Sequence, residues 1–342
     1  MIMRTVIVDR YGPPEVARIA EVPMPEPGPG QIRVRVGATI VGAADAVMRA
    51  GSPRYARIAS GFRRPRHAVP GGDFAGVVDA LGEGARWFAV GDRVHGTLAP
   101  ASGGNAEYLV IAEDAAVVPT PAGLDDAGAA AVVDGFLTAT PFLRDLGRVG
   151  PGDEVLVVGA AGAVGSSAVQ VAKALGARVT AVTSTPNLDL VRALGADLVI
   201  DRTAGPAQAT AKADLVARGV SGYDVVFDAV GGWSFGTARP LLGPRGAYLT
   251  TVPSLGVLAL AVPTKLLRRR RTAIAFTGLR SAAAKRADLE LLGRLVAEGR
   301  IREVVDRVLP LERVADAHRR VDGGHKAGAV VLVTARVEAT AR

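Results

Sequence analysis

The most informative part of the sequence is the stretch Val155-Leu-Val-Val-Gly159-Ala-Ala-Gly162-Ala-Val-Gly165-Ser-Ser-Ala-Val-Gln170. An apolar run with strand character leads into three glycines at a spacing of three, and a helical pattern follows. A glycine-rich turn lets backbone N–H groups approach a diphosphate, and the next helix adds partial positive charge at its N-terminus. Gly165 would also allow the helix to pack closely on the strand. The alternative is a tight turn that binds nothing.

The residues around this stretch alternate between strand and helix patterns, which favours the binding turn. Short apolar runs are separated by helical segments that end at glycine, as in a parallel sheet covered on both faces. We expect strands at 154–158, 178–183, 198–200, 223–229 and 247–252, and helices at 164–175, 188–194, 207–218 and 233–242.

The flanking segments have a different character. Before the alternation come short strands broken by turns rich in glycine and proline, and then an alanine-rich helix. At 342 residues the chain is long enough for two domains. We expect strands at 4–9, 31–38, 76–81, 93–96 and 329–334, and helices at 124–146, 288–298 and 311–321.

Composition excludes several classes of site. The chain has no cysteine, which removes disulfides, thiolate metal sites and a cysteine nucleophile together. Its four histidines (67, 95, 318 and 325) are dispersed and have no metal-ligand spacing. We interpret His95, following a strand, and His318, in a late helix, as structural.

The net charge of +8 raises the question of a nucleic-acid partner. The runs Arg268–Arg271 and Arg63-Arg64-Pro-Arg66 lack interleaved aromatic residues, so we interpret them as solvated and expect no nucleic-acid partner. The N-terminus lacks the pattern of a signal peptide, and the apolar segment 252–267 is shorter than the roughly 20 residues of a membrane span. We therefore expect a cytoplasmic protein with no membrane partner.

The end of the second expected strand bears on which dinucleotide binds. NAD-binding proteins usually carry an acid there for the ribose 2′-hydroxyl. Here Thr183, Ser184 and Asn187 provide hydroxyl and amide groups instead. This favours NADPH, with NADH bound more weakly.

Several further motifs occur in order along the chain. They are Gly71-Gly-Asp73-Phe-Ala-Gly76, Trp87-Phe-Ala-Val-Gly91-Asp-Arg-Val-His95-Gly96, Gly103-Gly-Asn-Ala-Glu107-Tyr108, Leu137-Thr138-Ala139, Val226-Phe-Asp228-Ala-Val-Gly231-Gly232 and Gly324-His-Lys326-Ala-Gly328. With the glycine turn, they make nearly the whole chain resemble the zinc-free quinone oxidoreductase (zeta-crystallin-like) branch of the medium-chain dehydrogenase/reductase superfamily.

This resemblance implies an α/β fold in which a GroES-like β-rich catalytic domain carries an inserted Rossmann domain. The expected domains are residues 1–123 plus 261–342 and residues 124–260, respectively. Relatives of this kind are commonly homodimers. The cofactor site is expected to contain Thr138, which would lie near the nicotinamide, together with Gly159, Ala161, Gly162, Ala163, Val164, Gly165, Thr183, Ser184, Asn187, Arg202, Asp228, Ala229, Val230, Gly231 and Lys326. Alternatively, Asp228 caps a strand-end turn and Thr138 serves only its helix.

Three departures from the family pattern affect the expected chemistry. Gly71-Gly-Asp73 stands where zinc-dependent relatives have Gly-His-Glu, so no metal is expected. The loop 41–45, which carries a proton donor in many relatives, is nearly inert; Asp45 supports it or acts in catalysis, and Tyr55 is a second candidate. Arg202 replaces a common Tyr and either substitutes for the cation that meets the 2′-phosphate or is an ordinary surface residue.

Three functions are consistent with these observations. The first is NADPH-dependent reduction of a quinone or of an α,β-unsaturated carbonyl compound. The second is reduction of an enoyl thioester in polyketide or fatty-acid metabolism, in which the arginines of loop 51–70 would meet a phosphopantetheine or coenzyme A tail. The third is NADPH binding without catalysis, as a sensor or structural protein.

Overall fold

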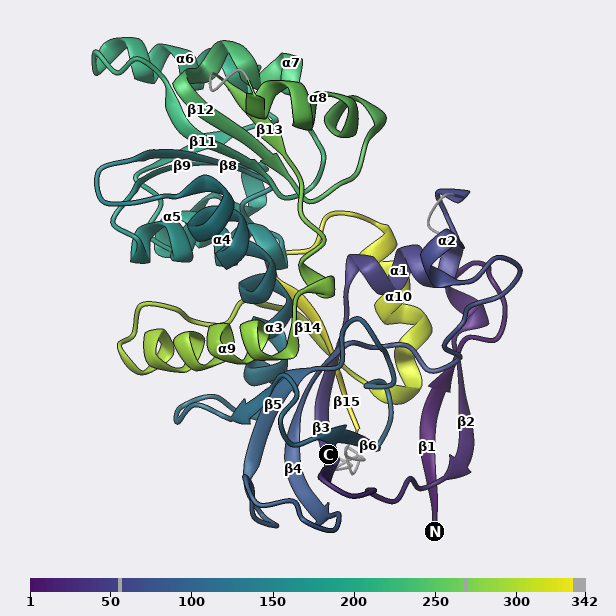
Figure 1. Cartoon of the computed structure of the whole chain (residues 1–342). Helices are drawn as coiled ribbons and strands as arrows, with labels where there is room; N and C mark the ends of the chain where they lie inside the picture. Colours follow the sequence, from purple (N-terminus) through teal and green to yellow (C-terminus); the bar gives the residue numbers. More distant parts are fainter. Residues whose placement is uncertain (55–56, 267–269, 335–342) are drawn as a thin grey trace, which may run out of the picture. The chain divides into compact units, whose positions relative to one another are not determined.

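The computed structural model describes residues 1–54, 57–266 and 270–334. The chain forms two compact units (Figure 1). Unit 1 comprises Met1–Asp134, Gly278–Glu298 and Arg302–Arg342, and unit 2 comprises Gly135–Thr277 with Gly299–Ile301. The inserted domain is expected at 124–260, whereas the two compact units divide inside helix α3 (Asp126–Thr140) and after Thr277.

Unit 2 is built on a parallel sheet of six strands in the order β10-β9-β8-β11-β12-β13. Numbered within the unit, this is the doubly wound order 3-2-1-4-5-6, which reverses between β8 and β11. In such sheets ligands bind at the carboxyl ends of the strands beside this reversal. The strands are β8 (Glu154–Val158), β9 (Arg178–Thr183), β10 (Leu198–Asp201), β11 (Tyr223–Asp228), β12 (Leu242–Thr250) and β13 (Arg271–Ala273).

Helices cover both faces of this sheet. Helices α4 (Ala163–Ala174) and α5 (Leu188–Ala193) lie on one face, and α6 (Ala207–Ala217), α7 (Phe235–Ala238) and α8 (Leu255–Leu266) lie on the other (Figure 1). The second face packs around the fully buried Tyr223, Val226 and Leu242. This double cover explains why the strands are continuous apolar runs.

Two helices of unit 2 differ from expectation. The helix expected at 233–242 is only α7 and a 3-10 turn at Arg239–Leu241, because Pro240 has no N–H to continue it and β12 already begins at Leu242. Helix α8 was not expected, since Gly256 and Pro263 interrupt its pattern. Among the described residues, no helix is both long and apolar enough to cross a bilayer.

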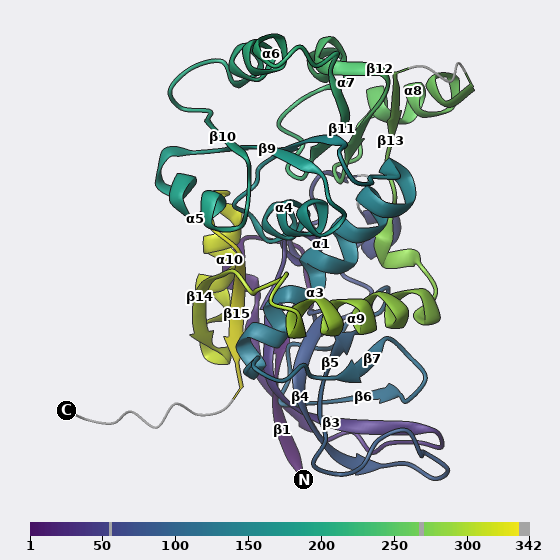
Figure 2. The same cartoon turned by 90° about the vertical axis from the view of Figure 1, so that its left-hand side faces the viewer.

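Unit 1 contains a mainly antiparallel sheet of seven strands (Figure 2). The order is β14-β15-β3-β4-β5-β7, and β6 also pairs with β3. These strands are β3 (Gln31–Val41), β4 (Asp73–Leu81), β5 (Arg93–Thr97), β6 (Tyr108–Ala112), β7 (Val117–Pro119), β14 (Val305–Pro310) and β15 (Ala329–Val333). A separate antiparallel pair is formed by β1 (Ile2–Ile7) and β2 (Arg18–Pro23). The helices are α1 (Ala43–Ala50), α2 (Arg57–Ser60), the first part of α3, α9 (Ala282–Ala297) and α10 (Val314–Asp322).

The interpretation of residues 41–45 as a loop was wrong. Val41 is the last residue of β3, Gly42 is the N-cap of α1, and Ala43 begins that helix. The Asp45 carboxylate accepts a hydrogen bond from the Gly42 N–H at 2.8 Å, which closes the first helical turn. His95 lies within β5 rather than after it, and it is fully buried.

Candidate active site

The glycine turn of unit 2 connects β8 to α4 at the reversal of strand order. Gly159 has a φ of +78°, a region that residues with side chains rarely adopt. A Cβ at Gly159 would lie 2.5 Å from a Val230 methyl carbon, so Val230 occupies the space that a side chain would need. The turn is thereby packed against the loop that follows β11.

Helix α4 approaches this turn closely because position 165 has no side chain. A Cβ at Gly165 would lie 2.1 Å from the Gly159 carbonyl oxygen and 2.9 Å from the Ala160 Cα. Both neighbours are backbone atoms and cannot move aside. Gly165 therefore sets the distance between the helix and the end of β8.

The first turn of α4 presents backbone N–H groups. Gly162, the N-cap, supplies no capping side chain, and the first helical hydrogen bond runs from Ser166 N–H to the Gly162 oxygen at 2.8 Å. The N–H groups of residues 163–165 therefore precede the hydrogen-bonded part of the helix. Such groups, with the helix dipole, bind anions such as a diphosphate. These residues fit the diphosphate of a dinucleotide, and Ala161 lies in the same turn.

Asp228 organises the loop after β11. Its carboxylate is fully buried and accepts hydrogen bonds from the N–H groups of Val230 (3.1 Å), Gly232 (3.2 Å) and Trp233 (2.7 Å) and from the Tyr248 hydroxyl (3.1 Å). Both carboxylate oxygens are thus engaged by groups of the protein itself. Asp228 thus holds the loop of Ala229, Val230 and Gly231 against the glycine turn, and the Val230 side chain remains 55% exposed beside it.

The carboxyl end of β9 is adjacent to an acid that the sequence analysis missed. Thr183 pairs in register with Asp201 of the neighbouring strand β10. The Asp201 carboxylate accepts a hydrogen bond from the Thr185 hydroxyl at 2.6 Å, and this bond, with those from Thr203, holds the pKa of Asp201 below its usual range. Its position directly before Arg202, a residue expected at the cofactor, was the signal in the sequence that could have revealed this acid.

The other predicted residues at this end are close to Asp201 in sequence or in the sheet. The Asn187 amide donates to the Ser184 hydroxyl oxygen at 3.3 Å, and the Thr183 carbonyl oxygen accepts the Arg202 N–H at 2.9 Å. The Arg202 side chain is exposed. The adenosine ribose of a dinucleotide bound here would thus lie near both a cation, Arg202, and an anion, Asp201.

Thr138 lies on α3 within unit 2. Its side chain is half-buried, and its hydroxyl is 3.5 Å from the hydroxyl of Thr277. Tyr55 lies outside the described residues.

Unit 1 contains a separate group of buried ionisable residues. Asp45 also accepts the Gly71 N–H at 3.3 Å, and a Cβ at Gly42 would lie 3.5 Å from Asp45 Oδ2 and 3.8 Å from Asp134 Oδ2. Burial raises the pKa of Asp45 to about 6, and the Asp134 charge adds to that rise. Burial also raises the pKa of Asp134 and of Asp73, the latter further through the charges of Asp134 and Asp45.

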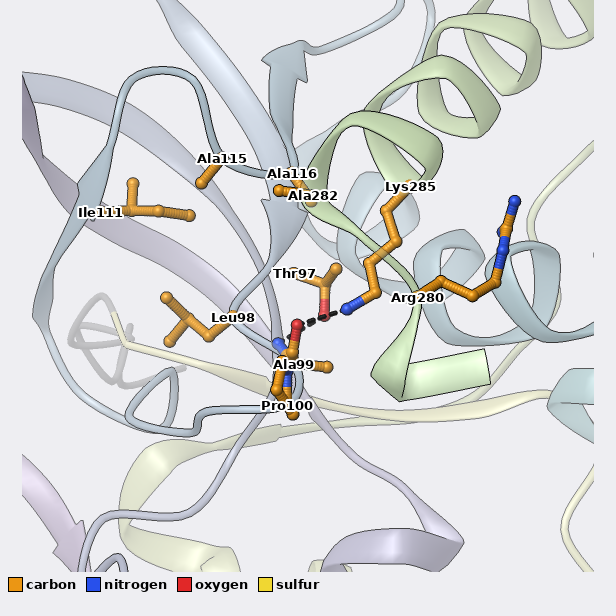
Figure 3. Close-up of a pocket in the computed structure, with 10 residues that line it drawn as sticks. All are labelled: Thr97, Leu98, Ala99, Pro100, Ile111, Ala115, Ala116, Arg280, Ala282 and Lys285. Carbon is orange, nitrogen blue, oxygen red and sulfur yellow. Dashed lines mark hydrogen bonds between the residues drawn. The ribbon is translucent and has the colours of Figure 1, made fainter. Parts of the chain in front are cut away.

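Two lysines of unit 1 partly balance these carboxyl groups. The Lys285 ammonium lines a cavity of about 210 Å³ and donates to the Ala99 carbonyl oxygen (Figure 3). It also donates to the Gly278 carbonyl oxygen at 2.6 Å. Lys326 donates to the Gly328 carbonyl oxygen at 2.7 Å. Burial lowers the pKa of both lysines, whereas the carboxylates of Asp73 (for Lys285) and Asp134 (for Lys326) oppose that change. Lys326, predicted to bind the cofactor, thus belongs to this cluster in unit 1.

Within the described residues, no group of three or more histidine, aspartate or glutamate side chains is arranged to hold a metal ion. The prediction of a metal-free site stays a prediction.

A doubly wound parallel sheet with uncapped N–H groups at its reversal point, combined with a mainly antiparallel β unit, indicates the class of nicotinamide-dependent dehydrogenases and reductases. The "Alcohol dehydrogenase GroES-like domain" family matches residues 28–122, and the "Zinc-binding dehydrogenase" family matches residues 194–332.

Individual relatives agree with these family matches. The mitochondrial NAD(P)H oxidoreductase RTN4IP1 of Mus musculus is 30% identical over 97% of this chain and 89% of its own length. The solved quinone oxidoreductase of Coxiella burnetii has a TM-score of 0.83 and 26% identity, covering 98% of this chain and 100% of that one. The polyketide synthase component PikAII of Streptomyces venezuelae is 33% identical over 92% of this chain but only 8% of its own length. The chain belongs to the medium-chain dehydrogenase/reductase superfamily, in the branch of the quinone oxidoreductases.

The first prediction concerns Gly165. Gly165→Ala should force the backbone of α4 away from Gly159, lower the free energy of unfolding by about 1–3 kcal/mol and weaken NADPH binding by at least about tenfold. Thermal unfolding and cofactor titration would measure both effects. Gly150→Ala is the matched control, because a Cβ there meets nothing within 4 Å. Unchanged cofactor affinity in Gly165→Ala would contradict the assigned turn.

The second prediction concerns Asp45. Because its pKa of about 6 exceeds the unfolded value, the folded state binds this proton more tightly, and the resulting stability is lost as pH rises from about 4 through 6. Asp45→Asn should therefore flatten the fall in unfolding free energy over this range by about 2–3 kcal/mol. Denaturant unfolding at a series of pH values would test this. An unchanged slope would show that folding does not shift the pKa of Asp45.

Proposed function

We propose that this protein transfers hydride from NADPH to a quinone or to the double bond of an α,β-unsaturated carbonyl compound, without zinc. The observation that carries the proposal is the α4 turn, whose uncapped N–H groups face the reversal point of the sheet. The bound nicotinamide would supply the hydride.

The chain's own residues would bind and orient the two reactants. The N–H groups of residues 163–165 would hold the diphosphate, and the exposed Val230 side chain beside Gly159 would give an apolar surface for the adjoining nucleoside. Asp228 would keep this surface in place through its four hydrogen bonds. Thr138 would orient the nicotinamide end, and solvent would protonate the product.

The donor set of the chain argues for conjugated acceptors over alcohols. Metal-dependent alcohol oxidation uses a bound ion to lower the pKa of the alcohol. This chain has no cysteine, and its described residues contain no arrangement of ligands for such an ion. A quinone ring or the β-carbon of an enone accepts hydride without this help.

We therefore expect metal-free enzyme to reduce quinones or enones with NADPH and to leave simple alcohols unoxidised with NADP⁺. Steady-state assays in the presence of a chelator, with elemental analysis of the same sample, would test this. Stoichiometric zinc whose removal abolishes activity, or alcohol oxidation without turnover of any conjugated acceptor, would refute it.

We also infer a preference for NADPH, in which Arg202 would pair with the 2′-phosphate. The neighbouring Asp201 opposes this preference, because its pKa is lowered and its carboxylate stays charged. A charge-assisted bond from an exposed arginine to a phosphate contributes about 1.5–3 kcal/mol and outweighs a carboxylate already engaged by Thr185 and Thr203.

The two neighbouring residues should have opposite effects on cofactor choice. Arg202→Ala should weaken NADPH binding roughly tenfold and leave NADH binding nearly unchanged, because only NADPH carries the 2′-phosphate. Asp201→Asn should favour NADPH over NADH. Dissociation constants measured by fluorescence titration would provide the comparison. Equal losses for both cofactors in Arg202→Ala would show that Arg202 does not bind the phosphate.

The second candidate function is reduction of an enoyl thioester, which the similarity to the polyketide synthase component favours. An enoyl-coenzyme A substrate added to the assay above separates the two. The third candidate, NADPH binding without catalysis, predicts cofactor binding with no turnover of any of these acceptors. We propose further that the protein works in the cytoplasm as a homodimer and has no nucleic-acid partner.

A further inference from the structure

The segment between α1 and β4, residues 51–72, is strongly basic. It contains five arginines, one histidine and no acidic residue. The arginines are Arg54, Arg57, Arg63, Arg64 and Arg66, and the histidine is His67. We call this segment the arginine loop.

Two large apolar side chains of the arginine loop are exposed among these charges. Ile58 is 79% exposed and Phe62 is 83% exposed. Arg63, Arg64 and Arg66 are exposed as well, and none of the three forms an ion pair with a described residue. The loop therefore combines unpaired positive charge with apolar surface that water hydrates poorly.

Part of the loop is held by Tyr11, which lies in the segment after β1. The Tyr11 hydroxyl contacts the Ser60 hydroxyl at 2.9 Å and donates to the Gly61 carbonyl oxygen, and the Arg57 guanidinium lies 4.6 Å from the centre of the Tyr11 ring. Gly61 has a φ of +121°, and a Cβ there would lie 2.1 Å from the Arg64 carbonyl oxygen. Tyr11 and this tight turn fix the two ends of the segment that carries Phe62 and Arg63.

We propose that the arginine loop is the surface by which this protein docks on an anionic phospholipid bilayer. The arginines would pair with the headgroups, and Ile58 and Phe62 would enter the boundary between headgroups and acyl chains. Clustered arginines beside exposed apolar side chains are the composition that binds peripheral proteins to such surfaces.

A bilayer fits this surface better than a small anion or a nucleic acid does. A single phosphate is usually held in a concave site, and the cavities lined by Thr97 and Lys285 and by Trp233 and Leu260 include no residue of the loop. A nucleic acid would use stacked aromatic side chains, whereas Phe62 is the only aromatic residue exposed in the described part of the loop. Moving the exposed Ile58 side chain out of water is favourable only if it enters an apolar medium such as the bilayer.

This inference changes one expectation of the sequence analysis. No membrane partner was expected because no segment can span a bilayer, but peripheral docking needs no spanning segment. Its functional meaning rests on the proposed function: a quinone with a long apolar tail partitions into membranes, so docking would bring the enzyme to that substrate.

The test is sedimentation of the full-length protein with large vesicles of phosphatidylglycerol and phosphatidylcholine, and with vesicles of phosphatidylcholine alone. We expect binding to the anionic vesicles only, weakened by high salt. The triple variant Arg63→Gln, Arg64→Gln, Arg66→Gln should bind on the order of a hundredfold more weakly. The double variant Ile58→Ser, Phe62→Ser should also bind more weakly, without the change in salt dependence.

The matched control removes three exposed arginines of unit 2, in the triple variant Arg192→Gln, Arg239→Gln, Arg245→Gln. It should bind vesicles like the wild type. Equal losses in both triple variants would show that net charge alone attracts the protein, and would overturn the proposal. The proposal is equally wrong if wild type fails to sediment while coenzyme A or single-stranded DNA binds the loop.

A water-soluble quinone keeps this inference distinct from the proposed function. Wild type and all variants should reduce it at the same rate, which also shows that the variants fold. Vesicle binding without any quinone turnover would refute the proposed function and leave the docking surface standing. Turnover without vesicle binding would do the reverse.

Discussion

Helix α4 can lie against the end of β8 only because residue 165 has no side chain, and the cofactor site depends on that contact. The Gly159 carbonyl oxygen occupies the space beside Gly165, and a Val230 methyl group occupies the space beside Gly159. The end of β8, the start of α4 and the loop after β11 thus pack closely because residues 159 and 165 are both glycine. This packing places the uncapped N–H groups of α4 at the reversal point of the sheet. A larger residue at position 165 would push them away from it.

Much of this unit could be predicted, because each element is determined by residues next to one another. The strand at 154–158 is a continuous apolar run, and the structure places β8 at Glu154–Val158. The prediction was wrong where a helix forms from residues with low helix propensity. Gly256 and Pro263 are poor helix residues, yet α8 includes both, since Val257 packs into the core against α6 and β12. A loop was expected at residues 41–45, but α1 begins at Ala43. The Asp45 carboxylate accepts a hydrogen bond from the Gly42 N–H and caps this helix start.

The candidate site could be predicted less completely, because its contacts join distant strands. Asp201 was overlooked since it ends the third strand of unit 2, and the pairing of β9 with β10 brings it to Thr183. The cluster of Asp45, Asp73 and Asp134 was equally invisible, as 28 and 61 residues separate its neighbours in sequence (73 − 45 and 134 − 73). Its members come from α1, β4 and α3, and their raised pKa values follow from burial, which no local pattern reveals.

The hydrogen bonds that the Asp228 carboxylate accepts affect how the cofactor binds. The carboxylate accepts three hydrogen bonds from the backbone N–H groups of Val230, Gly232 and Trp233, so this loop has little conformational freedom left to lose. A dinucleotide meeting such a surface displaces water but does not have to order the protein beneath it. This side of the site is therefore preorganised. The free energy of binding is not reduced by ordering the loop, and it can hold the nicotinamide in one orientation.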